Sequence, residues 1–327
     1  MTNTLLICVA CLLAGTGSVM FAEYAAAANT SDQTPDELVE QGQRALLQRK
    51  FREAAELATK AIEQKPDLPA AFVLRGRARQ RLGQLDEAIG DLTQAVKLKP
   101  SAEAHLIRGE CHSALDRHKN AIADFDRTLE LEPRLHAAYH HRGRERFKNG
   151  EIEKSIADFD KMIELEPAHE NECWERGLSR YYAGQFALAQ KSFEDYHKVG
   201  PRDIENGLWR MISQAEVAGL PAAQKDLLKY DPKERPPFPL AYDLYAGQSK
   251  PEFVIEHALD GATDETDKKT RTFYAHLYVG LWFVASHDRP AATAHLEKAA
   301  ALRSTDYMWY VAREQLKRLK AEPSGKQ

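Results

Sequence analysis

Apolar and polar positions follow a helical spacing in two consecutive segments, "AAFVLRGRARQRLG" (70–83) and "DEAIGDLTQAVKLKP" (86–100). In the second segment Ala88, Leu92 and Ala95 stand at i, i+4 and i+7, which places them on one face of a helix. The glycine that closes the first segment is typical of a helix end followed by a tight turn. The proline that closes the second cannot donate the hydrogen bond that would continue a helix. The pattern therefore predicts two helices joined by a turn.

This pair of segments recurs along the chain at a period close to 34 residues. The stretches "AIADFDRTLELEP" (121–133) and "SIADFDKMIELEP" (155–167) are identical at 9 of 13 positions and start 34 residues apart. A fixed period of this length indicates stacked repeats. The markers of the period are Arg-Gly pairs that begin at Arg75, Arg108, Arg142 and Arg176, and prolines at Pro66, Pro100, Pro133, Pro167 and Pro201.

The repeated units resemble tetratricopeptide repeats (TPRs), of the variant R-G…G-x-[FYIL]-x-x-A-[IL]-x-D-[FL]…P. The resemblance implies an all-α, right-handed superhelical solenoid in which each helix pair buries its apolar face against the next pair. Five units are expected within 35–203, and a sixth, degenerate unit is expected at 273–306. The five units span 35–68, 69–102, 102–135, 136–169 and 170–203, and the degenerate unit keeps Gly280, Ala292 and Ala299.

Outside these units the period is lost. Residues 204–272 are interpreted as a non-repeat helical segment, 307–320 as a helix that caps the last repeat, and 321–327 as a disordered tail. This layout is similar to the C-terminal half of the NlpI-type exported TPR lipoproteins. That likeness implies a scaffold for envelope proteases or cell-wall hydrolases, with self-association through the repeats.

The first residues predict export. The run from Leu5 to Ala22 carries no charge, and Ala25 and Ala27 follow it with the spacing of a signal-peptidase site. We therefore interpret residues 1–28 as a signal peptide, with a retained single-pass anchor or lipid attachment at Cys11 as alternatives. Each alternative places the chain in the periplasm or outside the cell, free or membrane-anchored.

Composition narrows the classes of partner. The chain is 43% hydrophobic and 29% charged, with a net charge of −4 that becomes −3 without residues 1–28, so neither nucleic acid nor an anionic membrane is expected to bind. No cofactor or small-molecule substrate is expected, and a protein or peptide is the predicted partner. His136 and His140 have a metal-ligand spacing but lack a third ligand nearby in the sequence, so no metal site is predicted. Cys111 and Cys173 lie a whole repeat apart, which predicts buried free thiols.

Four arginines and three aspartates repeat in phase. Each of the first three arginines precedes an aspartate by sixteen residues, and the first unit lacks both members. Because the two residue types are present or absent together, we interpret them as a structural ladder of ion pairs. Its members are Arg75, Arg108, Arg142, Arg176, Asp91, Asp124 and Asp158. Ser192 replaces the fourth aspartate and Leu57 precedes the first arginine, so one arginine is expected to lack its partner.

The family pattern places several side chains on the concave groove. They are Arg77, Gln80, Arg81, Glu110, His140, Arg144, Lys148, Trp174 and Tyr182, together with Phe147 and Tyr181, for which packing between repeats is the alternative. Basic residues outnumber acidic ones in this set, and rings beside arginines are typical of binding hot spots. The predicted ligand is a peptide with an acidic residue or a C-terminal carboxylate.

The sequence therefore favours a non-enzymatic, exported adaptor that binds a protein or peptide in its groove. One alternative is a structural subunit of an envelope complex that uses the convex face and the 204–272 segment. A remote alternative is an enzyme whose site is built from the C-terminal helices, with Asp243, Tyr245 and His257 as candidate groups.

Overall fold

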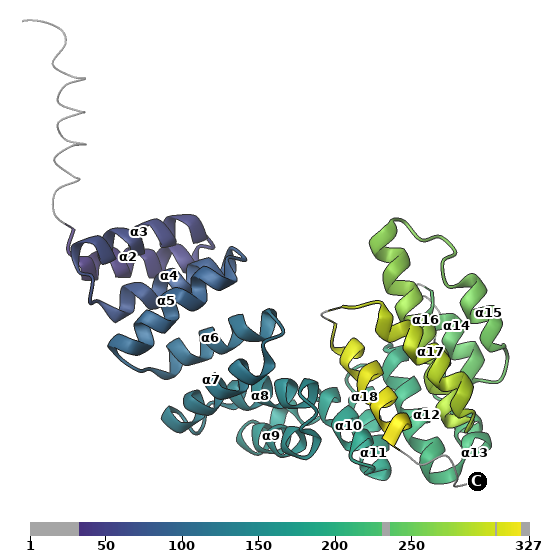
Figure 1. Cartoon of the computed structure of the whole chain (residues 1–327). Coiled ribbons are helices and arrows are strands. Elements are labelled where there is room, and N and C mark those ends of the chain that lie inside the picture. The colour runs from purple at the N-terminus through teal and green to yellow at the C-terminus, as the bar shows by residue number, and fades with distance from the viewer. Residues whose placement is uncertain (1–32, 231–235, 305, 322–327) are drawn as a thin grey trace, which may run out of the picture. The chain divides into compact units, whose positions relative to one another are not determined.

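The computed structural model describes residues 33–230, 236–304 and 306–321, and every regular element in these ranges is a helix (Figure 1). The all-α prediction is confirmed. The predicted signal segment 1–28 and all but the first residue of the predicted tail lie outside the described residues. Among the helices that are described, none has the length and apolar character that a membrane crossing requires.

The chain divides into two compact units, residues 1–100 and 101–327, which we call the N-terminal unit and the C-terminal unit. The N-terminal unit holds two helix pairs. They are α2 (Pro35–Leu47) with α3 (Phe51–Gln64), and α4 (Pro69–Arg81) with α5 (Leu85–Leu98). Helix α2 begins at a capping box, in which Thr34 Oγ1 accepts from the Glu37 amide at 3.3 Å and Glu37 Oε2 accepts from the Thr34 amide at 2.9 Å.

The C-terminal unit continues with three helix pairs of the same kind and then a larger helical assembly. The pairs are α6 (Ala102–Ala114) with α7 (His118–Leu131), α8 (His136–Lys148) with α9 (Ile152–Leu165), and α10 (Trp174–Tyr182) with α11 (Phe186–His197). A 3₁₀ turn, η1 (Pro167–His169), follows α9. The remaining helices are α12 (Ile204–Ala218), α13 (Leu220–Lys225), α14 (Phe238–Tyr245), α15 (Pro251–His257), α16 (Glu265–Ala285), α17 (Arg289–Ala301) and α18 (Tyr307–Ala321).

In several pairs a glycine on the first helix lets the second helix approach closely. At Gly109 an added β-carbon would lie 2.7 Å from the ring of Phe125, and at Gly177 it would lie 2.8 Å from the ring of Phe193. Both rings are fully buried. Since real β-carbons do not approach rings so closely, the conserved spacing of these glycines along the chain reflects a packing requirement.

The turn inside each pair uses a left-handed backbone conformation. Gly150 and Gly184 have φ of 80° and 74° in this turn. The corresponding position in the third unit is Asp116, with φ of 54°. Aspartate is one of the few residues besides glycine that adopt this conformation readily, so the third unit keeps the turn without the glycine of the motif.

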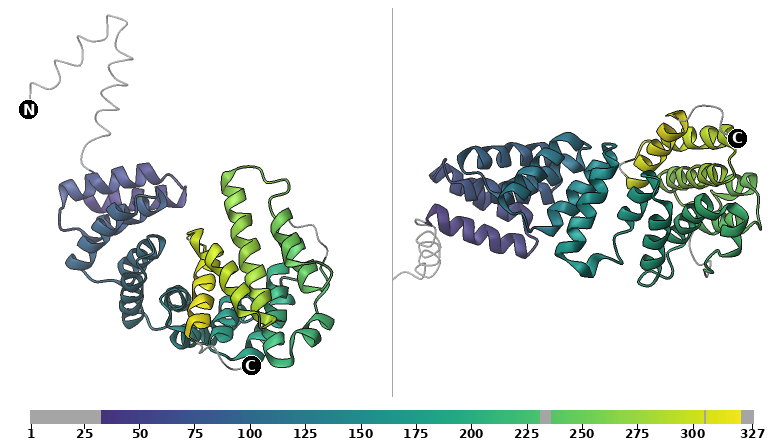
Figure 2. Two further views of the ribbon diagram at one scale, coloured as in Figure 1. Left: turned by 45° about the vertical axis from the view of Figure 1, so that its right-hand side comes forward. Right: turned by 90° about the horizontal axis from the view of Figure 1, so that it is seen from below.

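The apolar core of the C-terminal unit thickens toward its end. Helices α16, α17 and α18 pack side by side in this order, as the green and yellow ribbons in Figure 2 show. Together with α12 they bury large side chains in one core. The sixth helix pair, expected at 273–306, corresponds to α16 and α17, with α16 beginning eight residues earlier, at Glu265. At its centre an added β-carbon on Gly280 would lie 2.7 Å from Leu296 Cγ, the same device that the earlier pairs use.

Candidate functional site

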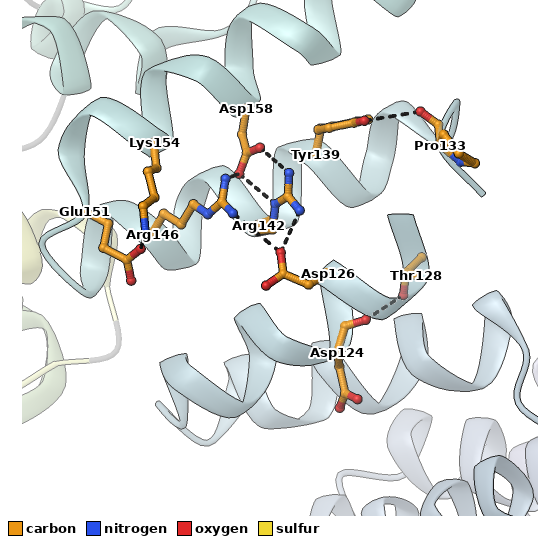
Figure 3. Close-up of polar contacts among 10 residues, drawn as sticks. All are labelled: Asp124, Asp126, Thr128, Pro133, Tyr139, Arg142, Arg146, Glu151, Lys154 and Asp158. Carbon is orange, nitrogen blue, oxygen red and sulfur yellow. Dashed lines mark hydrogen bonds and ion pairs between the residues drawn. The ribbon is translucent and has the colours of Figure 1, made fainter. Parts of the chain in front are cut away.

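The repeated arginines and aspartates form ion pairs within the second, third and fourth helix pairs. Arg142 donates to Asp158 from Nε at 3.0 Å and from Nη2 at 2.6 Å, and Arg146 adds a third bond at 2.8 Å (Figure 3). The same two-pronged bond joins Arg75 to Asp91 at 2.9 and 2.7 Å, and Arg108 to Asp124 at 2.9 and 2.6 Å. Paired donors on a carboxylate fix the angle between two helices as well as their distance.

Arginines of the ladder also bond to the preceding helix pair, which the sequence did not predict. Arg142 Nη1 donates to Asp126 of the preceding helix pair at 2.6 Å. Arg176, whose own unit offers Ser192, donates to Asp160 at 3.2 Å in the same way. Arg176 is only 7% exposed. The expectation that one ladder arginine lacks a partner is therefore wrong for Arg176, because a carboxylate from the previous unit takes the place of the missing aspartate.

The ladder extends one step beyond the predicted repeats. Arg210 on α12 stands 34 residues after Arg176, and it donates to Asp226 at 2.6 Å and to Glu194 at 3.1 Å. Helices α12 and α13 thus continue the stack, although we interpreted 204–272 as a non-repeat segment. The sequence signal was the 34-residue step itself, which the motif search missed because Met211 stands where the earlier units have glycine.

In the N-terminal unit, three predicted groove residues lie on α4. Arg77 and Gln80 are half-buried, and Arg81 is exposed at the end of the helix. The same helix carries the ladder arginine Arg75 and also Arg79, which donates to Asp91 at 2.6 Å, so α4 is strongly basic. An acidic ligand for this helix stays a prediction.

In the C-terminal unit, the predicted basic groove residues have carboxylates beside them. Glu175, which is buried, lies 3.5 Å from His140 Nε2 and 3.8 Å from Arg144 Nε. Lys148 Nζ donates to Glu145 at 2.8 Å. The neighbouring Glu110 lies 3.5 Å from His141. The positive charges of Arg144 and Lys148 are therefore largely offset, which weakens the case for an acidic ligand here.

Helix α18 lies against the helices that carry these residues. The ring of Tyr307 stacks on Phe147 at a centroid distance of 5.0 Å and meets Trp174 edge-on at 5.3 Å. Tyr182 donates from its hydroxyl to the Val311 carbonyl at 3.3 Å. The sequence predicted that α18 caps the last repeat. The helix packs on α17 as expected, and it also reaches α8.

These contacts leave a pocket of about 460 Å³ between α10, α12, α16 and the start of α18. Two predicted groove residues, Arg144 and Trp174, line it. The other lining residues are Phe193, Asp203, Glu205, Asn206, Trp209, Tyr274, Asp306, Tyr307 and Met308. This pocket is the candidate binding site, because it brings the predicted aromatic and arginine groups together on one concave surface.

Sequence reasoning missed the half of the pocket that α12 and α18 supply. Trp209 and Tyr307 are 2% and 5% exposed, so both also serve the core. The 34-residue step to Arg210 could have identified α12 as an inner helix and so pointed to Trp209 beside it. Nothing in the local sequence of α18 shows that its first turn faces α10.

The remaining predicted groups are not assembled into a reactive site. Tyr245 is fully buried and donates to the Tyr278 carbonyl at 2.9 Å, whereas His257 is half-buried and pairs with Asp260 at 2.9 Å. Cys111 and Cys173 are free and buried, and burial raises the pKa of each thiol to about 12. In the described ranges, His, Cys, Asp and Glu side chains form no group of three or more that could hold a metal ion.

Comparison with known proteins identifies the repeats. Residues 73–135 and 136–169 match family models described as tetratricopeptide repeat. Among solved structures, a tetratricopeptide repeat protein from Parabacteroides merdae superimposes with a TM-score of 0.51 at 17% identity, covering 88% of this chain and 100% of that one. The C-terminal part of a TPR repeat-containing protein from Cytophaga hutchinsonii gives 0.50 at 18% identity, covering 84% and 98%. The fold is therefore the predicted TPR solenoid.

Relatives with higher identity share only a part of their length. Tetratricopeptide repeat protein 13 of Homo sapiens is 32% identical over 105 residues, which is 31% of this chain and 12% of that protein. DnaJ homolog subfamily C member 7 of Mus musculus is 35% identical over 94 residues, or 28% and 19%. Hsc70-interacting protein 1 of Drosophila melanogaster is 38% identical over 97 residues, or 29% and 25%. The chain thus spans a quarter or less of the length of these relatives.

Proposed function

We propose that this chain of tetratricopeptide repeats is a protein–protein interaction scaffold that holds a peptide segment of its partner in the pocket between α10, α12, α16 and α18. The observation that carries the proposal is the meeting of Arg144, Trp174, Trp209 and Tyr307 around one cavity of about 460 Å³. Neither the tetratricopeptide repeats alone nor α18 alone would form it.

The residue types around the pocket support a protein ligand. Tryptophan, tyrosine and arginine are enriched among residues that dominate binding energy, because they offer large contact areas with few rotatable bonds. The cavity lies within the range of about 300–1,000 Å³ found for ligand sites. Its volume suits one or two side chains of a peptide.

The name of one relative also supports a protein ligand. That relative, by its name, interacts with Hsc70, and it shares 38% identity with this chain over 97 residues. This likeness supports protein binding as the function that we propose for the repeats of this chain. The identity of the partner does not transfer, since the match covers 25% of that relative.

No catalytic role is part of the proposal. A nucleophilic cysteine needs a lowered pKa, whereas burial raises the pKa of Cys111 and Cys173 to about 12. The hydroxyl of Tyr245 is enclosed and bonded to a backbone carbonyl. Tyr245 and the two thiols therefore lack the accessibility that general acid–base or nucleophilic chemistry requires.

We place the scaffold outside the cytoplasm. The support is the uncharged run from Leu5 to Ala22 followed by Ala25 and Ala27, which is typical of a signal peptide. In this setting its partners would be envelope proteins such as proteases or cell-wall hydrolases. Self-association of the chain is a further proposal, and it follows from the resemblance to the NlpI-type exported TPR lipoproteins.

A capture experiment tests the proposed function. The chain without residues 1–28 is immobilised beside a variant with Arg144→Glu and Trp174→Ala, and both are exposed to envelope extract. We expect the wild type to retain a partner that the variant loses. The substitutions reverse a charge and remove an aromatic wall of the pocket, so the loss should be at least about tenfold.

The matched control carries Arg127→Glu and Leu131→Ala on α7. These side chains are exposed, Leu131 at 50%, and neither lines the pocket. Circular dichroism melting verifies that both variants are folded. A partner that the pocket variant retains as well as the control would move the interface elsewhere. The 204–272 segment would then be favoured, since Phe253 and Leu259 are 46% and 43% exposed there.

A further inference from the structure

Acidic side chains dominate the charge of the pocket. Its lining contains three carboxylates, Asp203, Glu205 and Asp306, and one guanidinium, that of Arg144. The guanidinium is itself close to the buried Glu175, at 3.8 Å. A ligand in this cavity therefore meets a negative potential, which is opposite to the carboxylate-binding groove that the sequence predicted.

The contacts of the carboxylates preserve their charge. Asp203 accepts from the Asn206 amide at 3.0 Å, and Asp306 accepts from the Tyr274 hydroxyl at 3.0 Å and from the Met308 amide at 2.8 Å. These donors are neutral, so they orient the carboxylates without neutralising them, and each carboxylate can accept further bonds. Burial, together with the charges of Glu205 and Asp306, raises the pKa of Tyr274, as expected for a phenol in a negative field.

The aromatic walls are suited to a cation. The guanidinium carbon of Arg144 lies 5.3 Å from the centre of the Tyr307 ring, so one wall already receives a cation of this chain. Trp174 meets the same ring edge-on at 5.3 Å, and Trp209 lines the cavity nearby. Ring faces attract cations through their quadrupole, and the attraction grows when water is excluded.

Three lining residues carry a buried polar atom that the described parts of the chain leave without a hydrogen-bond partner. They are Asn206 Oδ1, Trp209 Nε1 and Tyr307 Oη, on side chains that are 4%, 2% and 5% exposed. Asn206 Nδ2 donates to the Phe193 carbonyl at 2.9 Å, which leaves its oxygen as an acceptor. Buried polar groups in native proteins are nearly always bonded, so such a cluster beside a cavity points to a ligand with N–H donors and an acceptor.

We infer that the pocket takes a basic side chain, arginine or lysine, from a peptide of the partner. This inference rests on the proposed function and names the chemistry that its site selects. The cationic group meets Asp203 and Asp306, its stem lies against the half-buried ring of Trp174, and the adjoining peptide group supplies an acceptor for Trp209. The start of α18 thereby completes the site, because the helix contributes Tyr307 and the residue before it is Asp306.

Peptide binding tests the inference directly. The probes are N-acetylated, C-amidated nonapeptide libraries with arginine, lysine, citrulline, leucine or glutamate fixed at the central position and mixed neutral residues elsewhere. Citrulline has nearly the shape of arginine without its charge. We expect the arginine and lysine libraries to be retained by the immobilised chain at least about tenfold better than the citrulline and glutamate libraries.

The variants separate the pocket from the rest of the surface. Asp203→Asn with Asp306→Asn removes two charges, and asparagine preserves the helix-capping bonds. The matched control, Asp264→Asn with Asp288→Asn, removes two charges from the caps of α16 and α17, outside the pocket. We expect the preference for basic peptides to fall about tenfold in the first variant and to stay unchanged in the control.

Absence of a preference for arginine or lysine, or an equal loss of that preference in both variants, would overturn the inference. If that result came with a partner whose capture depends on Arg144 and Trp174, the proposed function would stand and only the ligand chemistry would be wrong. If the partner were also retained by the Arg144→Glu, Trp174→Ala variant, the proposed function itself would fail.

Discussion

Glu145 shows how a single charged residue is stabilised inside this array. The side chain is 1% exposed, and it accepts bonds from Ser113 at 2.7 Å and from Lys148 at 2.8 Å, with His118 Nδ1 at 2.6 Å. Burial alone would raise the pKa of Glu145, but the bond with His118 and the charge and bond of Lys148 outweigh it and lower the pKa to about 2. The ionised form is therefore the one that the folded protein stabilises.

We predict that Glu145→Gln lowers the free energy of unfolding at pH 7 by about 2–3 kcal/mol. A carboxyl whose folded pKa lies below its usual value of 4.5 stabilises the protein above pH 4.5, and this contribution is lost as the pH falls toward 2. The difference between wild type and variant should therefore shrink between pH 4.5 and 2 in urea titrations. The exposed Glu164→Gln serves as control, and a difference that is independent of pH would contradict the explanation.

Among individual residues, the sequence predicted the arginine–aspartate pairs of the ladder. It did not predict the additional carboxylates that bond to the same arginines. Arg142 and Asp158 were paired from their common phase, because both recur once per repeat. The contacts of Asp126 and Asp160 were not predicted, because each bonds to an arginine of the following helix pair and the motif describes one pair at a time. Interfaces between repeats therefore contain residues that a single-repeat pattern cannot identify.

Individual helices depend on where their glycines lie. In the N-terminal unit, an added β-carbon on Gly76 of α4 would lie 2.7 Å from Leu92 Cγ, and Leu92 is fully buried. Gly90 of α5 is also inside a helix, but nothing lies within 4 Å of its added β-carbon. The two positions carry the same residue for different physical reasons.

Alanine at these two positions should therefore have opposite effects. We predict that Gly76→Ala lowers the free energy of unfolding by about 1–3 kcal/mol, because the methyl group overpacks the helix interface. Gly90→Ala should raise it by about 0.5–1 kcal/mol, since alanine loses less backbone entropy in a helix. Chemical denaturation of the two variants beside wild type measures both changes. Stabilisation by Gly76→Ala would show that the interface has room and would refute the close-packing argument.

The sequence of α18 predicted that the helix exists but not all of its contacts. Its apolar face and length predicted a helix, and the stack required a cap, so its existence and its contact with α17 followed from the sequence. Its contacts with α8 and with the turn between α6 and α7 did not. Tyr310 donates to Asp116 at 2.6 Å across a separation of 194 residues, and no local pattern specifies such a pairing.

For the molecule as a whole, periodicity carried most of the prediction. The 34-residue step gave the fold class and the order of the first helix pairs, because each pair must bury its apolar face on the next. The candidate site was predicted only in part. Arg144 and Trp174 came from the repeats, but the three carboxylates and three of the aromatic rings come from α12, α16, α18 and the residues directly before α12 and α18, where the motif fades. Those residues reverse the charge expected of the ligand.

The central claim is that the partner binds at the pocket that Trp174 lines. The most direct measurement places a photo-cross-linking phenylalanine analogue at position 174 in the native cell, and in a second strain at the exposed Leu131 of α7. We predict that light yields a cross-linked partner from position 174 and not from position 131. The same partner cross-linked from position 131, with none from position 174, would contradict the account.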